Sequence, residues 1–476
     1  MNDKIEEDKK NLKTELYKDD FRIEHDLLGN ERIPKNSYWG IHTYRALNNF
    51  NLAERKVNFQ LIKAIAVVKK ACALTNYELN YISKAVCGAI VSACDEIYND
   101  KIEKENFPTD ALQGGAGTST NMNVNEVIAN RGIEILGEEK GNYSIIHPIE
   151  HVNLHQSTND VYPTALKIAA IEECRKLNTE IAKLQGICQE REKAFQGIIK
   201  MGRTQMQEAV PILLGQEFGA FAEAFSRDRW RTFKCEERLK IVNIGGTAVG
   251  TGIGANKKYI FRVIEILRSL TGMNLSRGEN LLDATSNVDC FVEVSGMLKA
   301  FASNLSKVSQ DLRLMAVLGE ITLPPKQAGS SIMPGKVNPV IIETVLQGCM
   351  KVIANDIAIS CATSNGTLQI NEFMPLIADS LLDSFAILRK SAIALGDYIR
   401  LIAANPLRCE YYVNRSTSII TAFLPAIGYE KCTALVKEFQ RLHPDSEASF
   451  RGFLEENLGK EIVDKYLDPK NLIQAS

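Results

Sequence analysis

Four segments of the 476-residue chain gather glycine, hydroxyl and amide side chains more densely than a connector between helices needs. Two of them stand directly before helical patterns, at residues 114–123 (GGAGTSTNMN) and 156–160 (QSTND), and the others are 202–207 (GRTQMQ) and 328–339 (AGSSIMPGKVNP). Glycines let the backbone approach a ligand, and hydroxyl groups beside the free N–H groups of a helix start suit an anion. The pattern indicates a site for a small anionic molecule.

The four segments differ in how much each says alone. Residues 114–123 are equally consistent with an elaborate helix cap, capping explains residues 156–160 best, and residues 202–207 are uninformative. Residues 328–339 place two adjacent serines between glycines, then Lys336 and Asn338, just before a helix. Backbone N–H groups, a cation and an amide together make a carboxylate-binding nest, so we interpret this segment as functional.

Three other patterns are weaker. Residues 250–255 (GTGIGA) satisfy a dinucleotide-binding pattern, but their surroundings are helical and Glu265 lies within a helix, so a flexible turn is expected. His147, His151 and His155 have helical spacing, but Pro148 favours a loop over a metal site. The 11 cysteines include no C-x-x-C pair, and we expect buried thiols without disulfides.

Long amphipathic helices must position these segments. Phe291, Val294, Leu298 and their successors to Met315 recur in steps of three and four, which predicts a helix over 289–318. Similar patterns predict helices over 162–200, 211–243 and 376–404, and strand patterns are scarce. The fold class is therefore all-α, with a central bundle of long helices. Such helices also favour self-association.

The helical patterns begin near Asn58, and residues 1–60 read as irregular loops. We expect a charged, solvated arm at 1–20, an N-terminal domain at 21–156, the long-helix domain at 157–408 and a small C-terminal domain at 409–476.

Composition excludes several classes of protein. The formal net charge of -2 gives no overall attraction to nucleic acid or anionic membranes. No uninterrupted apolar run approaches the roughly 18 residues of a membrane span, and the charged N-terminus has no apolar core of a secretory signal. We therefore expect a cytoplasmic protein whose partners are a small-molecule substrate and its own copies.

The fourth segment, GSSIMPGKVNP, resembles the G-S-S-x-M-P-x-K-x-N signature of the aspartase/fumarase superfamily. The resemblance extends from residue 20 to residue 432 through RIEHDLLGNERIP, YWGIHTYRALNNF, GAGTSTNMNVNEVIANR, HVNLHQSTNDVYPTALKIA, GRTQMQEAVPILLGQEF, IGGTAVGTGIGAN and ITAFLPAIGYEK. Within the superfamily the chain is more similar to aspartate ammonia-lyases than to class II fumarases. Thr158 replaces the second serine of the fumarase Q-S-S-N-D, Gln205 replaces a histidine, and IHTYRALNNF has the aspartase form.

The resemblance implies a homotetramer of three-domain, all-α subunits whose central domains form a multi-helix core. It also implies that loops of three different subunits build each active site, so that Thr118, Ser157 and Ser330 would come from three chains. The implied reaction is the reversible elimination of ammonia from L-aspartate to give fumarate.

The family's motifs also imply a role for each site residue. Ser330 would be the base that takes the proton from the β-carbon, and Lys336 and Asn338 would bind the α-carboxylate. The hydroxyl groups that would stabilise the developing enediolate are those of Thr118, Ser157, Thr158 and Ser331. The residues that would hold the amino end of the substrate are Asn159, Thr204 and Gln205.

Other activities remain open at this stage. Class II fumarase uses nearly the same scaffold to eliminate water, and His147 stands where fumarases have a histidine of a secondary site. Cleavage of a larger succinyl-amine and a non-catalytic structural homologue are further alternatives. The implied scheme requires no organic cofactor and no metal, with a divalent cation such as Mg2+ as a possible activator.

Overall fold

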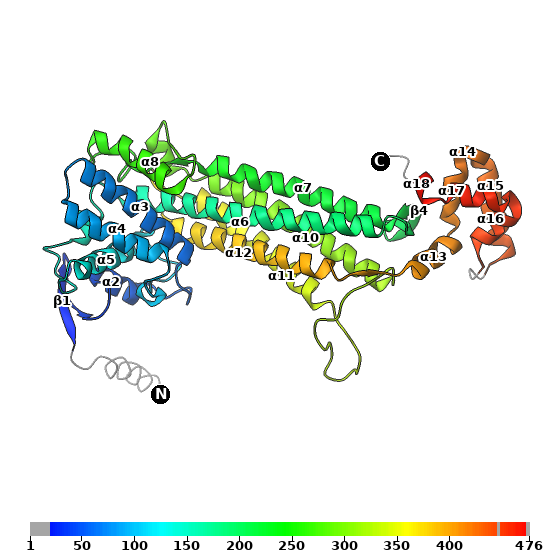
Figure 1. Cartoon of the computed structure of the whole chain (residues 1–476), viewed down its shortest axis with the longest axis horizontal. Coiled ribbons are helices and arrows are strands. Elements are labelled where there is room, and N and C mark those ends of the chain that lie inside the picture. The colour runs from blue at the N-terminus through cyan, green and yellow to red at the C-terminus, as the bar shows by residue number, and fades with distance from the viewer. Residues whose placement is uncertain (1–19, 445–447, 473–476) are drawn as a thin grey trace. The chain divides into compact units, whose positions relative to one another are not determined.

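The computed structural model describes residues 20–444 and 448–472, so the charged arm expected at 1–20 lies almost wholly outside the described residues. The described chain is all-α, as predicted, and its strands form only two-stranded sheets (Figure 1). The sheets pair β1 (Phe21–Asp26) with β2 (Gly29–Pro34), β3 (Ile199–Thr204) with β4 (Gln207–Leu213), β5 (Ile241–Val242) with β6 (Ser276–Arg277), and β7 (Ile321–Thr322) with β8 (Ala403–Ala404).

The expectation of irregular loops over residues 1–60 is wrong for much of the stretch. Strands β1 and β2 form an antiparallel hairpin, and helix α2 (Ile41–Asn49) follows it. The carboxylate of Glu126, which belongs to α5, accepts hydrogen bonds from the N–H groups of Gly40, His42 and Thr43 and so caps α2. Because this carboxylate lies more than 80 residues away in sequence, a local pattern cannot reveal the cap.

The elements that follow Asn58 confirm the predicted start of the helical region. The Asn58 side chain accepts a hydrogen bond from the N–H of Gln60 and caps α3. The shorter helices of this part and the segments around them are α3 (Phe59–Glu78), α4 (Lys84–Tyr98), η1 (Lys104–Asn106), α5 (Thr118–Ile135), the π-helical turn η2 (Pro148–Val152), α8 (Lys257–Thr271) and α9 (Leu281–Ser286).

The four predicted long helices are all present, and the structure adds a fifth. Each lies within a few residues of its predicted bounds. They are α6 (Thr158–Ala194), α7 (Leu214–Leu239), α10 (Cys290–Val317), α12 (Met374–Ile399) and the additional helix α11 (Val340–Ser364). Figure 1 shows these helices running alongside one another as consecutive passes of the chain.

The apolar stripe predicted along α10 is buried inside a single chain. Leu305 is fully buried, and every other member from Phe291 to Met315 is at most 3% exposed. This stripe is therefore already covered and does not supply the apolar surface for self-association. Exposed apolar side chains lie instead on α11, where Met350 and Ile357 are 62% and 61% exposed.

Helix α11 is also long and apolar enough, by length and composition alone, to cross a membrane. Glu343, Lys351 and Asp356 interrupt its apolar run. Its buried face carries Asn355 and Asp356, which bond to Ser384 on α12 and Ser295 on α10. Such polar contacts are typical of a helix packed among other helices.

The contacts divide the chain into two compact units. The first unit comprises residues 1–175, 233–297 and 354–386, and the second comprises 176–232, 298–353 and 387–476. In the second unit, aromatic and aliphatic side chains between Val413 and Leu467 form a core with Met201. The helices of this part are α13 (Pro406–Arg415), η3 (Thr417–Phe423), α14 (Leu424–Ile427), α15 (Tyr429–Leu442), α16 (Phe450–Leu458), α17 (Lys460–Tyr466) and α18 (Pro469–Leu472), and all but α18 contribute to this core.

The cysteines are free thiols, as predicted. Nine are buried, Cys290 is partly exposed, and Cys361 on α11 is the one exposed thiol among the 11, all of which the structure describes. Burial raises the pKa of several of these thiols, among them Cys72 and Cys188, to about 12. These buried cysteines act as small apolar residues of the core.

The buried stripe of α10 leads to a stability prediction. Leu305→Ala should lower the free energy of unfolding by about 2–5 kcal/mol, because it leaves a cavity at a fully buried position. Val317→Ala, at an 85% exposed position of the same helix, should change it by no more than about 0.5 kcal/mol. Urea denaturation followed by circular dichroism measures both. Equal effects would show that the stripe is not packed as described.

Candidate active site

The first polar segment forms the start of helix α5 in the first unit. Gly117 is the N-cap residue and has a φ of 91°, and a Cβ atom there would lie 2.3 Å from the ring of buried Tyr162. Only glycine fits this turn. It leaves Thr118 exposed at the helix end, with its hydroxyl donating to the carbonyl oxygen of Gly115 at 2.7 Å.

The second polar segment starts helix α6 and is fixed by a buried carboxylate. Asp160 is fully buried and accepts hydrogen bonds from the N–H groups of Ser157 (3.0 Å), Gly245 (3.1 Å) and Thr247 (2.9 Å). Burial raises its pKa to about 7, and these N–H groups oppose that shift. Asp160 thereby fixes Ser157, Thr158 and Asn159 against the glycine-rich turn at 245–247.

The first two segments lie together within one chain. The side-chain amide of Asn121, one turn after Thr118, donates to the hydroxyl oxygen of Thr158 at 3.1 Å. Gly117 also approaches Tyr162, which lies one turn beyond Thr158 on α6. The resemblance had implied that Thr118 and Ser157 come from different chains. Their closeness here means that one chain can supply both.

The third segment lies in the second unit and is a tight hairpin turn, not a simple connector between helices. Strands β3 and β4 pair up to Thr204 and Gln207, which leaves Gln205 and Met206 as the turn residues. Both have positive φ values, of 52° and 62°, which the hairpin requires but which strain residues other than glycine. The turn exposes Thr204 and Gln205 to solvent. Such strain is typical of functional positions.

The fourth segment is an exposed loop of the second unit. The Ser330 hydroxyl oxygen accepts hydrogen bonds from the N–H groups of Met333 (2.9 Å) and Ile332 (3.2 Å). The base of the loop is closed by the Gly329 N–H, which donates to the Lys336 carbonyl oxygen, and by the Asn338 amide, which donates to the Gly329 carbonyl oxygen. The loop therefore holds its own shape around Ser330.

A buried ion cluster fixes the start of this loop and was missed by the sequence analysis. Glu320 is fully buried, and its carboxylate contacts the guanidinium of Arg203 at 2.5 Å and the ammonium of Lys200 at 3.0 Å. Arg203 directly precedes Thr204, and Glu320 directly precedes β7, from which the loop begins. One carboxylate thus joins the third segment to the strand that leads into the fourth. An isolated Glu carries no signal of such a contact in sequence.

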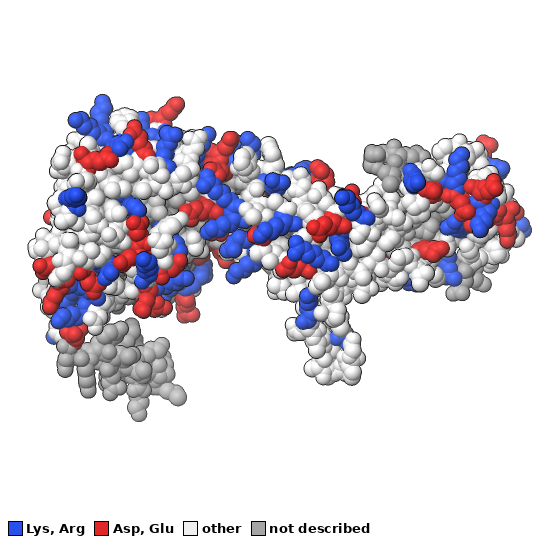
Figure 2. Space-filling model, in the orientation of Figure 1, with Lys and Arg blue, Asp and Glu red and all other residues white. Residues whose placement is uncertain are grey.

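The charges around Ser330 favour an anion. Residues 323–339 include two lysines, Lys326 and Lys336, and no acidic residue. In Figure 2 the loop that projects between α10 and α11 shows blue atoms and no red ones, whereas both colours alternate over the helices. This loop therefore offers a dicarboxylate two cations and no repulsion.

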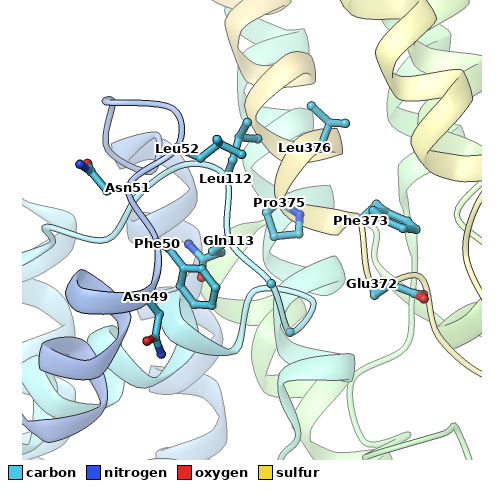
Figure 3. A pocket seen from close by; sticks show the side chains of 12 residues that line it. Asn49, Phe50, Asn51, Leu52, Leu112, Gln113, Glu372, Phe373, Pro375 and Leu376 are labelled. Atoms are coloured by element: carbon cyan, nitrogen blue, oxygen red, sulfur yellow. The ribbon is translucent and has the colours of Figure 1, made fainter.

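A cavity of about 610 Å³ opens beside the first segment, at Gly114 and Gly115 (Figure 3). Phe50 and Gln113 line one part of it, and Glu372 and Phe373 line another. Hydrogen bonds to the Glu372 carboxylate, from its own N–H and from Thr367, lower the pKa of that group, so the cavity holds a fixed negative charge. The cavity is therefore less suited to a dicarboxylate than the Ser330 loop.

The weaker sequence patterns lie in turns, except that residues 148–152 of the histidine pattern form the π-helical turn η2 and not the expected loop. Residues 250–255 form turns before α8, with positive φ at all three glycines. The ring nitrogen Nδ1 of His147 accepts from the N–H of Ile149, and that of His151 accepts from the N–H of His147. Within residues 20–444 and 448–472, no group of three or more His, Cys, Asp or Glu could hold a metal ion.

The chain combines long helices with hydroxyl- and amide-rich segments, one of which is the loop of Ser330, Lys336 and Asn338. This combination indicates the class of protein. The sequence profile of a lyase family matches residues 29–354. The chain belongs to this family of lyases, the aspartase/fumarase superfamily, and is an enzyme.

Named relatives lie close to the chain over nearly its whole length. It is 45% identical to the aspartate ammonia-lyase of a Bacillus species over 88% of this chain and 91% of the relative, and 43% identical to that of Helicobacter pylori over 95% and 98%. Among solved structures, a fumarate lyase from Brucella melitensis, described as bound to cobalt, has a TM-score of 0.90 at 42% identity. The match covers 94% of this chain and 98% of the chain in that structure.

A more distant structure of the superfamily is also similar. The class II fumarase of Schistosoma mansoni has a TM-score of 0.86 at 31% identity, over 94% of this chain and 98% of its own. The scaffold is therefore shared across the superfamily, and the loops must decide the activity.

The close approach of Gly117 to Tyr162 can be tested by substitution. Gly117→Ala should destabilise the protein by about 1–3 kcal/mol, because the added carbon meets the ring and the backbone is left-handed. Gly186→Ala is the matched control, since nothing lies within 4 Å of a Cβ atom there, in the middle of α6. It should leave stability unchanged or raise it by up to about 1 kcal/mol. Thermal melts compare the two, and an unaffected Gly117→Ala variant would contradict the described turn.

Proposed function

We propose that the protein is an aspartate ammonia-lyase that converts L-aspartate into fumarate and ammonia. The observation that carries this proposal is the Ser330 oxygen, which accepts two backbone N–H groups in a loop with two lysines and no acid. The choice of L-aspartate as substrate rests on the relatives named aspartate ammonia-lyase, which align with nearly the whole chain.

The reaction is difficult because the proton on the β-carbon of aspartate is barely acidic. It can leave only if the neighbouring β-carboxylate accepts the electron pair and becomes an enediolate. Fixed hydrogen-bond donors around that carboxylate therefore contribute most, because they gain strength as the charge develops. Thr118, Ser157, Thr158 and Ser331 are the donors that we assign to it.

Two amides have orientations that suit their proposed partners. The Asn159 side-chain NH2 donates to the Ala248 carbonyl oxygen at 2.7 Å, which leaves its carbonyl oxygen to accept from the substrate ammonium. The Asn338 NH2 donates one hydrogen to the Gly329 carbonyl oxygen, which leaves a second one for the α-carboxylate beside Lys336. Thr204 and Gln205 complete the amino end.

Ser330 is the proposed base. A serine alkoxide is unstable in water, but the N–H groups of Ile332 and Met333 and the nearby Lys336 charge would stabilise it. The β-carbon C–H bond breaks and its proton passes to the Ser330 oxygen. The C–N bond of the enediolate then breaks, a double bond forms between the α- and β-carbons, and ammonia leaves. Ser330 returns its proton to solvent.

The proposed scheme requires no cofactor. The chain's own hydroxyl, amide and lysine groups suffice for each step. A divalent cation such as Mg2+ stays an optional activator, and the scheme assigns no step to it.

We also propose that the enzyme is a homotetramer with shared active sites. The exposed apolar side chains of α11, among them Met350 and Ile357, support self-association. Thr118 and Ser157 lie together in the first unit, and Ser330 belongs to the second. Complementary loops from different chains would then meet at each site.

A single assay tests the proposed activity. Purified protein is incubated with L-aspartate, and in parallel with L-malate, while the absorbance of fumarate is followed. We expect fumarate from aspartate at a kcat/KM at least about 100-fold above that for malate, since the amino end has no fumarase-type histidine. Faster production from malate would establish the fumarase alternative, and fumarate from neither would refute both activities and leave a larger succinyl-amine substrate or the structural homologue.

The base assignment has its own test. Ser330→Ala should lower kcat by about 100-fold to 10,000-fold, because general base catalysis contributes about that much. Ser331→Ala, in the same loop, should cost less, since it removes one of several donors to the carboxylate. Circular dichroism must show unchanged helical content for both. A Ser330→Ala variant with near-normal kcat would refute the assignment.

Sharing of active sites is tested by mixing two variants of lowered activity, Ser157→Ala and Ser330→Ala, and allowing subunits to exchange. If the two serines of one site come from different chains, some mixed tetramers contain an intact site and activity should partly return. Mass spectrometry of differently labelled chains verifies the exchange. No recovery after verified exchange would mean that each chain builds its own site.

A further inference from the structure

Beneath the second polar segment lies a cluster of side-chain amides whose roles in catalysis are unassigned. Its centre is Asn153, whose carbonyl oxygen Oδ1 accepts from Lys69 (2.7 Å), Asn125 (3.1 Å) and Asn121 (3.2 Å). Lys69 lies on α3, and the two asparagines lie on α5. Asn121 alone among the three also bonds to Thr158, one of the proposed donors to the substrate.

The orientation of the Asn153 amide is fixed from both sides. Its NH2 group donates to the backbone carbonyl oxygen of Gln156 at 3.2 Å, and a carbonyl oxygen can only accept. On its other side, fully buried Lys69 donates to Asn153 and to the side-chain oxygen of Gln156 at 2.9 Å. Asn153 therefore presents its oxygen, and not its NH2, toward α5.

This orientation determines that of the next amide. Because the oxygen of Asn153 faces Asn121, the group of Asn121 that faces it must be the NH2. One hydrogen of that NH2 goes to Asn153, and the other goes to the hydroxyl oxygen of Thr158 at 3.1 Å. Both donors of the Asn121 amide are thus in use.

The last group in the series is the Thr158 hydroxyl. Its oxygen accepts from Asn121, and its own hydrogen has no acceptor among the described residues. Thr158 is 8% exposed, at the start of α6 and close to Ser157 and Asn159. One of the two lone pairs of this hydroxyl is occupied in this way and its hydrogen is free, so a carboxylate, which can only accept, would take a hydrogen bond from it.

We propose that Asn121, oriented by Asn153 and Lys69, is a positioning residue that fixes Thr158 as a hydrogen-bond donor to the substrate carboxylate. This inference rests on the proposed function, because it assigns an origin to one of the donors to the enediolate. A free hydroxyl would have to reorient as the charge develops, whereas this one is already aimed. Asn121 acts through Thr158 and does not touch the substrate itself.

Asn125 supplies a matched control. Like Asn121, it lies on α5, is fully buried and donates to the Asn153 oxygen, but its other contact is the sulfur of Met122 and not Thr158. Asn121→Leu should therefore lower kcat by about 10-fold to 100-fold with a smaller change in KM, because the lost donor acts mainly in the transition state. Asn125→Leu should stay within about 3-fold of the wild type, the size of an indirect effect.

A double-mutant cycle separates this role from a merely structural one. Thr158→Val should itself lower kcat by about 100-fold. If Asn121 acts through Thr158, the variant with both substitutions should be no slower than Thr158→Val alone by more than about 2-fold, because the relay then has nothing left to orient. The proposal would be overturned if the fold-losses of kcat from Asn121→Leu and Thr158→Val multiplied in the double variant. It would also be overturned if Asn121→Leu and Asn125→Leu lowered kcat equally.

Two further measures keep the test decisive. If Asn121→Leu does not fold, Lys69→Met is compared with Lys70→Met. Lys70 is a neighbouring lysine that pairs with Asp95 and takes no part in the relay. Only Lys69→Met should lower kcat. If the wild type acts on malate and not on aspartate, the proposed function fails but the cycle is run with malate, which forms the corresponding enediolate with a hydroxyl in place of the ammonium. If it acts on neither, the same pattern is sought in the Kd for fumarate.

Discussion

A polar side chain removed from water must find hydrogen-bond partners, and this requirement shapes the site of this enzyme. Three fully buried groups in the first unit, Asp160, Lys69 and Asn121, lie directly beneath the segment that carries Ser157, Thr158 and Asn159. The carboxylate can only accept, and the ammonium only donates. Their partners include the Ser157 N–H group and the Gln156 side-chain oxygen of that same segment, so satisfying the buried groups also fixes the segment.

The second unit applies the same rule with full charges. Glu320 is paired with two cations, and this pairing anchors both the hairpin turn of Gln205 and the start of the Ser330 loop. Beyond its anchored start, the loop relies on short-range hydrogen bonds and exposes Ile332 and Met333. A strongly held base and a lightly held tip suit a segment that must admit a substrate and then surround it.

The sequence predicted the parts of the fold that repeat. The apolar steps along α10 and α12 gave those helices to within a few residues, because a buried stripe must recur at the helical period. Strands β1 to β4 were missed, since short hairpins have little periodicity and the Gln205 turn lacks the glycine that usually marks one. The cap of α2 by Glu126 depends on contact between distant segments, which no local pattern contains.

The candidate site could be proposed from the sequence for a different reason. Ser330, Lys336 and Asn338 lie in one continuous segment, so their spacing alone indicated a carboxylate-binding loop. Glu320, Lys69 and Asn153 gave no such signal because each is an ordinary residue until the fold brings its partners together. Whether Thr204 and Gln205 meet the substrate stays a prediction.

The uneven burial of the cysteines gives the protein an unusual chemical property. Ten of its 11 thiols are shielded to some degree, so mild alkylating or spin-labelling reagents will meet essentially one target, Cys361, near the end of α11. The natural chain can therefore carry a single reporter group without any engineered cysteine. Because this thiol lies on the helix with the exposed Met350 and Ile357, the reporter would sense whatever comes to cover that surface.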